Sequence, residues 1–187
     1  MITGILLAAG VGSRFGSNKL LHPLPDGTPI AIAAARNLLG AVDKGIAVVR
    51  PSSAELADLL KAEGFQVIIS PDADEGMGNS IAFGIAAAKQ ADGWLITLAD
   101  MPYIRPGTLL EIRRLLEQAA PLVFPVYHGQ RGNPVGFGKP FLNALLSLSG
   151  DQGGRSIVNA NLSLAIQVAC DDPGVLVDID TREDILR

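Results

Sequence analysis

Residues 5–19 of this 187-residue chain read ILLAAGVGSRFGSNK. The short apolar run Ile5–Ala9 is typical of a buried strand. The segment after it, Gly10–Gly16, holds three glycines in seven positions. Glycines let the backbone approach a ligand closely and let successive amides point at one anion. Together with the cations Arg14 and Lys19, this segment predicts a phosphate-binding loop at the end of the first strand.

Three other loop types share some of these residues. The dinucleotide-binding fingerprint needs its third glycine one residue before Gly16 and a helix after it, whereas residues 21–25, LHPLP, cannot form a helix interior. A P-loop ends in Gly-Lys-Ser/Thr, but Gly16 is followed by Ser17. The third alternative is a flexible glycine turn with incidental charges.

The remaining sequence alternates short apolar runs with segments of helical spacing. The expected strands are Ile5–Ala8, Gly45–Val49, Gln66–Ile69, Trp94–Leu98, Leu122–Val126 and Leu164–Val168. The expected helices are Ile30–Leu39, Ile81–Lys89, one with a stripe of Leu56, Leu59 and Leu60, and one opened by Thr108 with Leu109, Ile112 and Leu116. This alternation predicts an α/β fold in one domain, residues 1–187: a three-layer sandwich with a mainly parallel, Rossmann-like central sheet. Ligands of such sheets bind beyond the carboxyl ends of the strands.

Composition narrows the classes of partner. The chain carries a net charge of −4 and no dense run of lysine and arginine, which argues against nucleic acid as a partner. No apolar run approaches the ~20 residues that span a bilayer, and no signal peptide opens the sequence, so no membrane partner is expected. The single cysteine, Cys170, excludes an internal disulfide framework and fits a reducing compartment. We therefore expect a cytoplasmic protein.

A carboxylate, Asp100, follows the expected strand Trp94–Leu98 and precedes Met101 and Pro102. Magnesium is a hard ion that takes one or two carboxylates plus phosphate oxygens, so a carboxylate beside a phosphate loop suits it. The alternative is that Asp100 caps a turn. The combination with the first loop favours Mg²⁺ bound by Asp100.

Two further segments leave alternatives open. Asp178 and Asp180 alternate along an expected strand end and so share one face, but Thr181 with Asp184 also forms a capping box. The segment 76–80, GMGNS, precedes a helix, where Asn79 or Ser80 could cap the helix or reach a base edge.

The loop residues resemble the nucleotidyltransferase signature Leu-Ala-Ala-Gly-x-x-x-Arg-x-Gly followed by lysine. The matching positions are Leu7, Ala8, Ala9, Gly10, Arg14, Gly16 and Lys19. The segments 76–80 (GMGNS), 100–102 (DMP), 131–137 (RGNPVGF) and 150–155 (GDQGGR) are also similar to elements of the molybdenum cofactor cytidylyltransferase group of the MobA-like nucleotidyltransferase family. The resemblance covers nearly the whole chain.

This resemblance implies a fold of the nucleotide-diphospho-sugar transferase type and transfer of CMP from CTP to the terminal phosphate of molybdopterin, with release of pyrophosphate. The loop amides and Arg14 would bind the β- and γ-phosphates, and Lys19 the α-phosphate. The implied nucleotide site comprises Leu7, Ala8, Ala9, Gly10, Gly12, Ser13, Arg14, Gly16, Lys19, Gly78, Ser80 and Asp100. Magnesium would be held by Asp100 and by Asp180 in preference to Asp178.

Acceptor contacts are expected from Asn133, Asp151 and Arg155, because an arginine suits a phosphate or a pterin edge and an aspartate can orient it. The group often has histidine at the position of Asn133. The alternative for the other two residues is a structural role, in which Asp151 caps a short helix and Arg155 is a surface cation. A molybdoenzyme that receives the product is a candidate partner.

Three competing classes remain open at this point. GTP or another phosphorylated acceptor could replace CTP and molybdopterin on the same fold. A non-catalytic chaperone could bind the pterin and hand it to a target enzyme. A nicotinamide-dependent oxidoreductase is disfavoured by the displaced third glycine.

Overall fold

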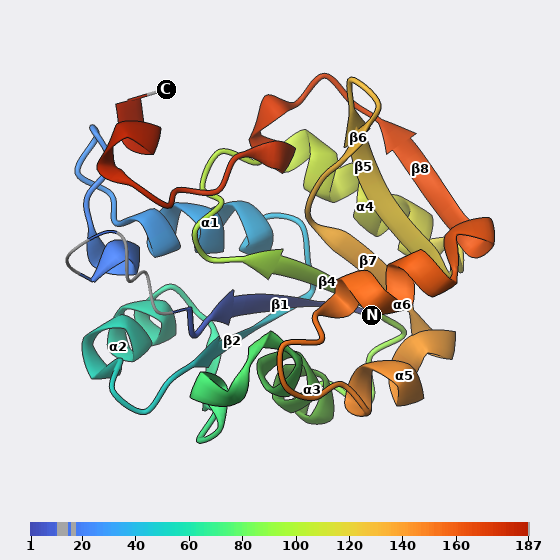
Figure 1. Cartoon of the computed structure of the whole chain (residues 1–187), viewed down its shortest axis with the longest axis horizontal. Helices are drawn as coiled ribbons and strands as arrows, with labels where there is room; N and C mark the ends of the chain where they lie inside the picture. The colour runs from blue at the N-terminus through green and yellow to red at the C-terminus, as the bar shows by residue number, and fades with distance from the viewer. Residues whose placement is uncertain (11–14, 16–17, 187) are drawn as a thin grey trace.

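The structure is a computed structural model that describes residues 1–10, 15 and 18–186 of the chain. Within these residues one mixed sheet runs through the molecule (Figure 1). Its strands are β1 (Ile2–Ala8), β2 (Lys44–Val49), β3 (Gln66–Ile69), β4 (Gly93–Leu98), β5 (Leu122–Tyr127), β6 (Gln130–Arg131), β7 (Val135–Gly138) and β8 (Ala165–Ala169). The order is β3-β2-β1-β4-β7-β5-β6, with β8 paired to β5. All six expected strands are confirmed, whereas β6 and β7 were not expected.

The pairing is mostly parallel, as expected. Strands β3, β2, β1 and β4 run parallel to one another, and β8 runs parallel to β5. Only the pairs that involve β6 and β7 are antiparallel among the described pairs. The short strand β7 therefore lies between β4 and β5, and it begins at the sheet edge where β4 ends, since Val135 pairs with Ile96.

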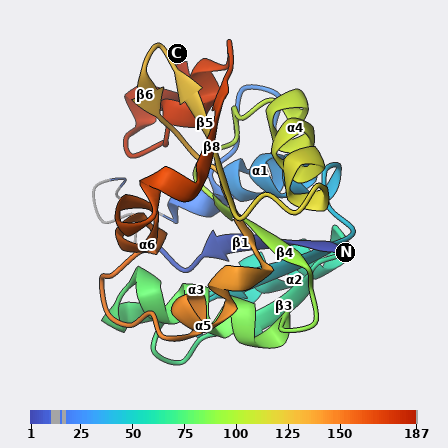
Figure 2. The same ribbon diagram turned by 90° about the vertical axis from the view of Figure 1, so that its right-hand side faces the viewer.

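Helices cover both faces of the sheet, which confirms the three layers. They are α1 (Ile30–Leu39), α2 (Ala54–Ala62), α3 (Met77–Ala87), α4 (Pro106–Glu117), α5 (Leu142–Leu146) and α6 (Gly154–Ala160). One buried cluster joins α1, α2 and α4 to the sheet, and a second joins α3, α5 and α6 to its opposite face. Figure 2 shows α1 and α4 on one side of β1 and β4, with α3 and α5 on the other.

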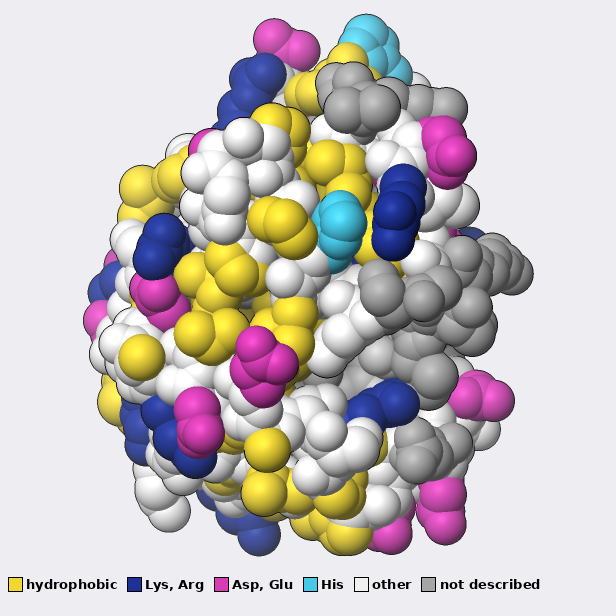
Figure 3. Space-filling model, turned by 90° about the vertical axis from the view of Figure 1, so that its left-hand side faces the viewer, with side chains coloured by type: hydrophobic (Ala, Val, Ile, Leu, Met, Phe, Trp, Pro, Cys, Tyr) yellow, Lys and Arg dark blue, Asp and Glu magenta, His cyan; other side chains and the backbone are white. Residues whose placement is uncertain are grey.

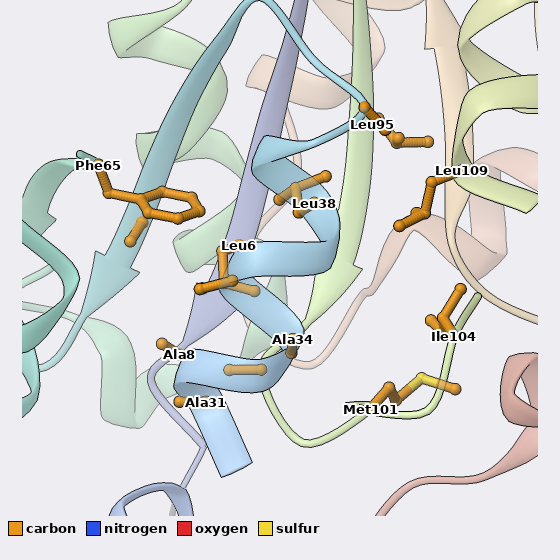
Figure 4. Packing of buried hydrophobic residues seen from close by; sticks show 14 of the residues in the cluster. Leu6, Ala8, Ala31, Ala34, Leu38, Phe65, Leu95, Met101, Ile104 and Leu109 are labelled. Carbon is orange, nitrogen blue, oxygen red and sulfur yellow. The ribbon is translucent and has the colours of Figure 1, made fainter. Parts of the chain in front are cut away.

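Side-chain alternation along β1 divides its residues between these two layers. Leu6 and Ala8 pack in the cluster under α1, where Ala31 and Ala34 let the helix lie close to the strand (Figure 4). Ile5 and Leu7 face the other layer, as the period of two in a strand requires. This division matters for the site, because Leu7 and not Ala8 faces the layer of α3.

The expected start of α4 at Thr108 is wrong. The helix begins at Pro106, because proline is well suited to the first helical position, where its missing N–H costs no hydrogen bond. The Thr108 hydroxyl instead donates to Oδ2 of Asp172, at 2.6 Å. Asp172 is only 2% exposed and also accepts from the amides of Arg105 and Gly174, at 2.9 and 3.0 Å. Asp172 thus joins the start of α4 to a segment late in the chain.

Replacing Asp172 by alanine is expected to lower the free energy of unfolding by about 2–3 kcal/mol, because three donors lose their acceptor in a buried place. Urea unfolding measures this loss. The matched control is Asp171→Ala, an exposed neighbour whose side chain should contribute within about 0.5 kcal/mol. Equal stability of the two variants would show that the Asp172 contacts are not stabilising.

Within the described residues, no helix is both long enough and apolar enough to span a bilayer.

Candidate active site

Parallel register brings the ends of β1, β2 and β4 to one edge of the sheet. Ala8 pairs with Val49, and Leu7 pairs with Leu98. Residues that follow these strands therefore come together, as the topology of parallel sheets predicts. The strands β1 and β4 point to the left of Figure 1, and Figure 3 views the molecule from that side, with acidic, basic and hydrophobic side chains intermixed outside the grey atoms.

Lys19 lies between two carboxylates at this edge. Its ammonium Nζ donates to Oδ2 of Asp100 at 2.8 Å and to Oδ1 of Asp180 at 3.1 Å. The Lys19 side chain is 7% exposed, that of Asp100 22% and that of Asp180 49%. Three residues expected to act together from the sequence are thus brought into contact, although Asp180 is 161 residues from Lys19.

The two carboxylates keep Lys19 charged. Burial alone would lower the pKa of the Lys19 ammonium, but the hydrogen bonds and negative charges of Asp100 and Asp180 outweigh it and raise the pKa above its ordinary value. The amine is therefore protonated throughout the neutral range. The Lys19 amine can therefore serve as a permanent positive charge but not as a general base.

The second oxygen of Asp100 fits a metal ligand. Among the described residues, Oδ1 of Asp100 is buried without a hydrogen-bond partner. An unpaired buried carboxylate oxygen is costly, and a hard cation would satisfy it. No group of three acidic, histidine or cysteine side chains that could hold a metal occurs within the described part of the chain. Asp100 and Asp180 would thus form a two-carboxylate site that needs oxygens from a ligand, which is the pattern that magnesium favours.

Asp180 reaches the site from a loop and not from a strand. Residues 177–180 have no strand structure, so the expectation that Asp178 and Asp180 alternate along a strand end is wrong. The amide of Ile179 donates to the Asp100 carbonyl at 2.9 Å and fixes this loop beside Asp100. The Asp184 carboxylate accepts from the amides of Asp180 and Thr181 and from the Thr181 hydroxyl, so the expected pairing of Thr181 with Asp184 is present. Asp178 is exposed.

A cavity of about 340 Å³ adjoins the lysine–carboxylate cluster. It combines backbone from the end of β1 with polar side chains from five other places in the chain. Its lining includes Leu7, Ala9, Gly10, Lys19, Arg50, Gly76, Met77, Ser80, Leu98, Asp100 and Asp151. This set brings together most of the expected nucleotide residues that the structure describes.

Arg50 was not expected in the site. It follows β2 directly, and its guanidinium donates to the Ala9 carbonyl through Nε, at 3.1 Å, and through Nη2. Arg50 therefore fixes the backbone where β1 turns into the glycine-rich loop. The signal in the sequence was its place just after a strand, where ligand-facing residues are common.

A larger cavity of about 660 Å³ lies next to the first and shares Leu7, Met77 and Leu98 with it. Its walls are partly apolar and partly cationic. The polar lining residues are Gln130, Arg131, Asn133 and Arg155, and the apolar ones include Ile96, Val135, Phe137 and Val158. Two expected acceptor residues, Asn133 and Arg155, thus line one cavity, whereas Asp151 lines the other.

The loop 149–153 forms the boundary between the two cavities, because Asp151 lines one and Gly153 the other. It packs on the start of α3 by backbone contact: the Gly78 amide donates to the Gly150 carbonyl at 2.8 Å. Asn79 accepts from the Gly150 amide at 3.0 Å. Neither Asn79 nor Ser80 caps α3, whose N-cap is Gly76. Asn79 holds the loop, and Ser80 faces the smaller cavity.

Other expected residues have different outcomes. Ala8 was expected in the nucleotide site, but its side chain is packed in the core under α1 and lines neither cavity. Gly78 contacts the loop 149–153, and Asp151 is exposed and does not cap α6, whose N-cap is Gly153. The expected residues Gly12, Ser13, Arg14 and Gly16 lie outside the described part of the chain.

A mostly parallel sheet with helices on both sides, and a lysine–carboxylate cluster beyond its strand ends, define the class of α/β enzymes that bind nucleotides at this edge. The chain belongs to the family of MobA-like NTP transferase domains, whose model matches residues 4–166. It is a nucleotidyltransferase.

Relatives with different named functions match this chain over nearly their whole length. The purine catabolism protein PucB of Bacillus subtilis is 30% identical over 98% of this chain and 93% of its own. Nicotine blue oxidoreductase of Paenarthrobacter nicotinovorans is 29% identical over 100% and 95%. The molybdenum cofactor cytidylyltransferase of Escherichia coli is 25% identical over 97% and 92%.

Solved structures agree with the fold. Rv0371c of Mycobacterium tuberculosis in complex with manganese has a TM-score of 0.82 at 26% identity and covers 100% of this chain and 96% of its own. A nucleotidyl transferase from Methanothermobacter has a TM-score of 0.83 at 25% identity and covers 100% and 95%. The fold of the nucleotide-diphospho-sugar transferase type is therefore confirmed.

Proposed function

We propose that the chain transfers CMP from CTP to the terminal phosphate of molybdopterin and releases pyrophosphate. The observation that carries this proposal is the position of Lys19 and Asp100 in the wall of the smaller of two adjoining cavities, with Asp180 hydrogen-bonded to Lys19. The smaller cavity has acidic and basic groups suited to a metal-bound triphosphate. The larger has an apolar lining and two arginines suited to a ring system with a phosphate.

The nucleotide would lie in the smaller cavity, with its α-phosphate near Lys19 and its base and sugar toward Leu7, Ala9, Gly10 and Ser80. The backbone at Ala8 and Gly78 would support this site from behind. Arg14 and the amides of Gly12, Ser13 and Gly16 belong to the proposal through the sequence signature, as ligands of the outer phosphates.

The reaction requires little proton chemistry from the protein. A terminal phosphate is largely ionised at pH 7, because its second pKa is about 6, so it can attack the α-phosphorus without a general base. Lys19 would offset the charge that grows on the α-phosphate as it becomes five-coordinate. A divalent ion held by Asp100 and Asp180, Mg²⁺ in the cell, would supply further charge neutralisation when bound.

The acceptor would occupy the larger cavity, with Arg155 and Asn133 as its contacts and Asp151 at the boundary with the nucleotide. Arg131 is a further candidate, because it lines the same cavity and is pre-oriented: its guanidinium lies 5.6 Å from the Phe124 ring and donates to Asn159 at 2.8 Å. A guanidinium held in this way loses less entropy when it binds a phosphate.

Replacing Arg155 by alanine is expected to raise the KM for the acceptor about tenfold, since one charge-assisted contact is lost, while the KM for CTP stays unchanged. Initial rates of pyrophosphate release at varied acceptor and varied CTP measure both constants. Arg36→Ala is the matched control, because it removes an exposed arginine that pairs with Glu63. An unchanged acceptor KM would remove Arg155 from the acceptor site.

The test of the whole proposal is incubation with labelled CTP, GTP or ATP, molybdopterin and Mg²⁺ or Mn²⁺, with pyrophosphate release as the signal and EDTA as the control. CMP transfer that EDTA abolishes would support the proposal. Transfer from GTP would replace it with guanylylation, and tight pterin binding without pyrophosphate would replace it with a cofactor-binding chaperone. We expect the reaction to take place in the cytoplasm, with a molybdoenzyme receiving the product.

A further inference from the structure

The ammonium of Lys19 occupies the two carboxylates, Asp100 and Asp180, that are proposed to bind the metal ion. The Lys19 ammonium binds one oxygen of Asp100 and one of Asp180, at 2.8 and 3.1 Å. These are the same two side chains that would hold a divalent ion. The remaining oxygen of Asp100, Oδ1, is buried and has no hydrogen-bond partner among the described residues. A metal ion that binds both carboxylates would therefore lie beside the Lys19 ammonium unless Lys19 moves.

We infer that Lys19 determines what the carboxylate pair accepts: it competes with a free divalent ion and makes the metal bind well only together with a polyphosphate. This inference rests on the proposed metal site at Asp100 and Asp180. Two cations in contact with the same carboxylates repel each other, so the metal binds less tightly while the ammonium stays on the carboxylates. The apparent affinity for metal then falls by the fraction of molecules in which Lys19 has left the carboxylates.

A triphosphate changes this competition in two ways. Its negative charges offer the Lys19 ammonium another partner. The ammonium can move from the carboxylates to the phosphates because it sits on a flexible four-carbon stem. Its oxygens also supply the metal with the ligands that two carboxylates do not provide. Metal and nucleotide therefore increase each other's affinity, and linkage requires the two effects to be equal. Lys19 contributes part of that coupling in addition to its proposed role at the α-phosphate.

The test is Mn²⁺ binding, followed by electron paramagnetic resonance, to the full-length protein with and without a non-hydrolysable CTP analogue. Lys19→Met, which keeps the length of the side chain and removes its charge, is expected to bind Mn²⁺ alone on the order of tenfold more tightly than the unmodified protein. The enhancement of Mn²⁺ binding by the analogue should be smaller in Lys19→Met. Lys19→Arg keeps a cation on the carboxylates and should bind Mn²⁺ alone as weakly as the unmodified protein does.

Two controls locate the effect. Lys61→Met removes an equal charge from an exposed pair with Asp58 and should leave Mn²⁺ binding unchanged. Asp100→Asn in the Lys19→Met background should cancel the gain. Thermal unfolding adds a second readout: Lys19→Met should melt at a lower temperature than the unmodified protein in EDTA, because two carboxylates are left facing each other, and should recover with Mn²⁺.

The outcomes separate the two proposals. If the unmodified protein and Lys19→Met bind Mn²⁺ alone equally, and Asp100→Asn weakens both, the inference about Lys19 is overturned while the metal site stands. If Asp100→Asn has no effect on Mn²⁺ binding with or without nucleotide, the metal site and the inference both fail. Tighter binding by Lys19→Met that Asp100→Asn cancels supports both.

Discussion

Asp100→Asn is expected to lower kcat for pyrophosphate release at least a hundredfold, with little change in melting temperature. The substitution keeps the shape of the side chain but removes the negative charge that faces Lys19, and it replaces one of the two carboxylate oxygens by an NH2 group that cannot bind a metal ion. Losing one preorganised charge at a phosphoryl-transfer centre typically costs 10²–10³ in rate, or about 3–4 kcal/mol of transition-state stabilisation. Rates at saturating CTP and acceptor, over a series of Mg²⁺ concentrations, measure the effect.

Asp178→Asn is the matched control for this prediction. Asp178 lies two residues from Asp180 on the same loop but is exposed. Its variant should retain activity within about twofold, whereas Asp180→Asn should fall between the control and Asp100→Asn, because Asp180 is more exposed than Asp100. Full activity of Asp100→Asn at all metal concentrations would exclude Asp100 as a metal ligand.

The sequence predicted the edge of the sheet where the site lies, and it did so for a physical reason. Buried parallel strands require continuous apolar runs, so the residue at which each run stops marks the carboxyl end of a strand. Asp100 was recognised in this way, and so was the loop after Ala8. The adjacency of β1 and β4 did not follow from the runs themselves, because the strand order depends on how the helices pack.

What the sequence did not show depends on contacts between distant segments. Asp172 stands in a run of turn-forming residues and gives no sign that it binds the start of α4. Asp180 was chosen by resemblance, and the strand expected to carry it does not exist. Its place beside Lys19 depends on the backbone contact of Ile179 with Asp100, which no local pattern encodes.

The same limit applies to the glycines of segment 76–80. A pattern in one segment shows that glycine permits a tight turn there, but it does not indicate which other part of the backbone lies nearby. The structure shows that a Cβ at Gly78 would lie 2.7 Å from the Gln152 carbonyl oxygen, and one at Gly76 2.2 Å from the Gly150 carbonyl carbon. These glycines are therefore needed because the loop 149–153 lies against them.

Gly76→Ala should therefore reduce the transferase activity strongly, although the substitution adds only one methyl group. Gly76 has φ +128°, which side-chain-bearing residues rarely adopt, and the added methyl group would force the loop 149–153 away from α3. Because this loop carries Asp151 and leads into Arg155, we expect kcat/KM for the acceptor to fall at least tenfold and the free energy of unfolding to fall by about 1–3 kcal/mol. Steady-state rates and urea unfolding measure the two effects.

Gly107→Ala is the matched control, because a Cβ there meets nothing within 4 Å in the first turn of α4 and should be neutral or slightly stabilising. Asn79→Ala removes the side-chain hydrogen bond to Gly150 without adding an atom, so it should weaken acceptor use in the same direction but less. If Gly76→Ala lost stability while keeping the acceptor KM, the loop would be structural only. A raised acceptor KM in both Gly76→Ala and Asn79→Ala would instead show that the loop's position against α3 sets the shape of the acceptor cavity.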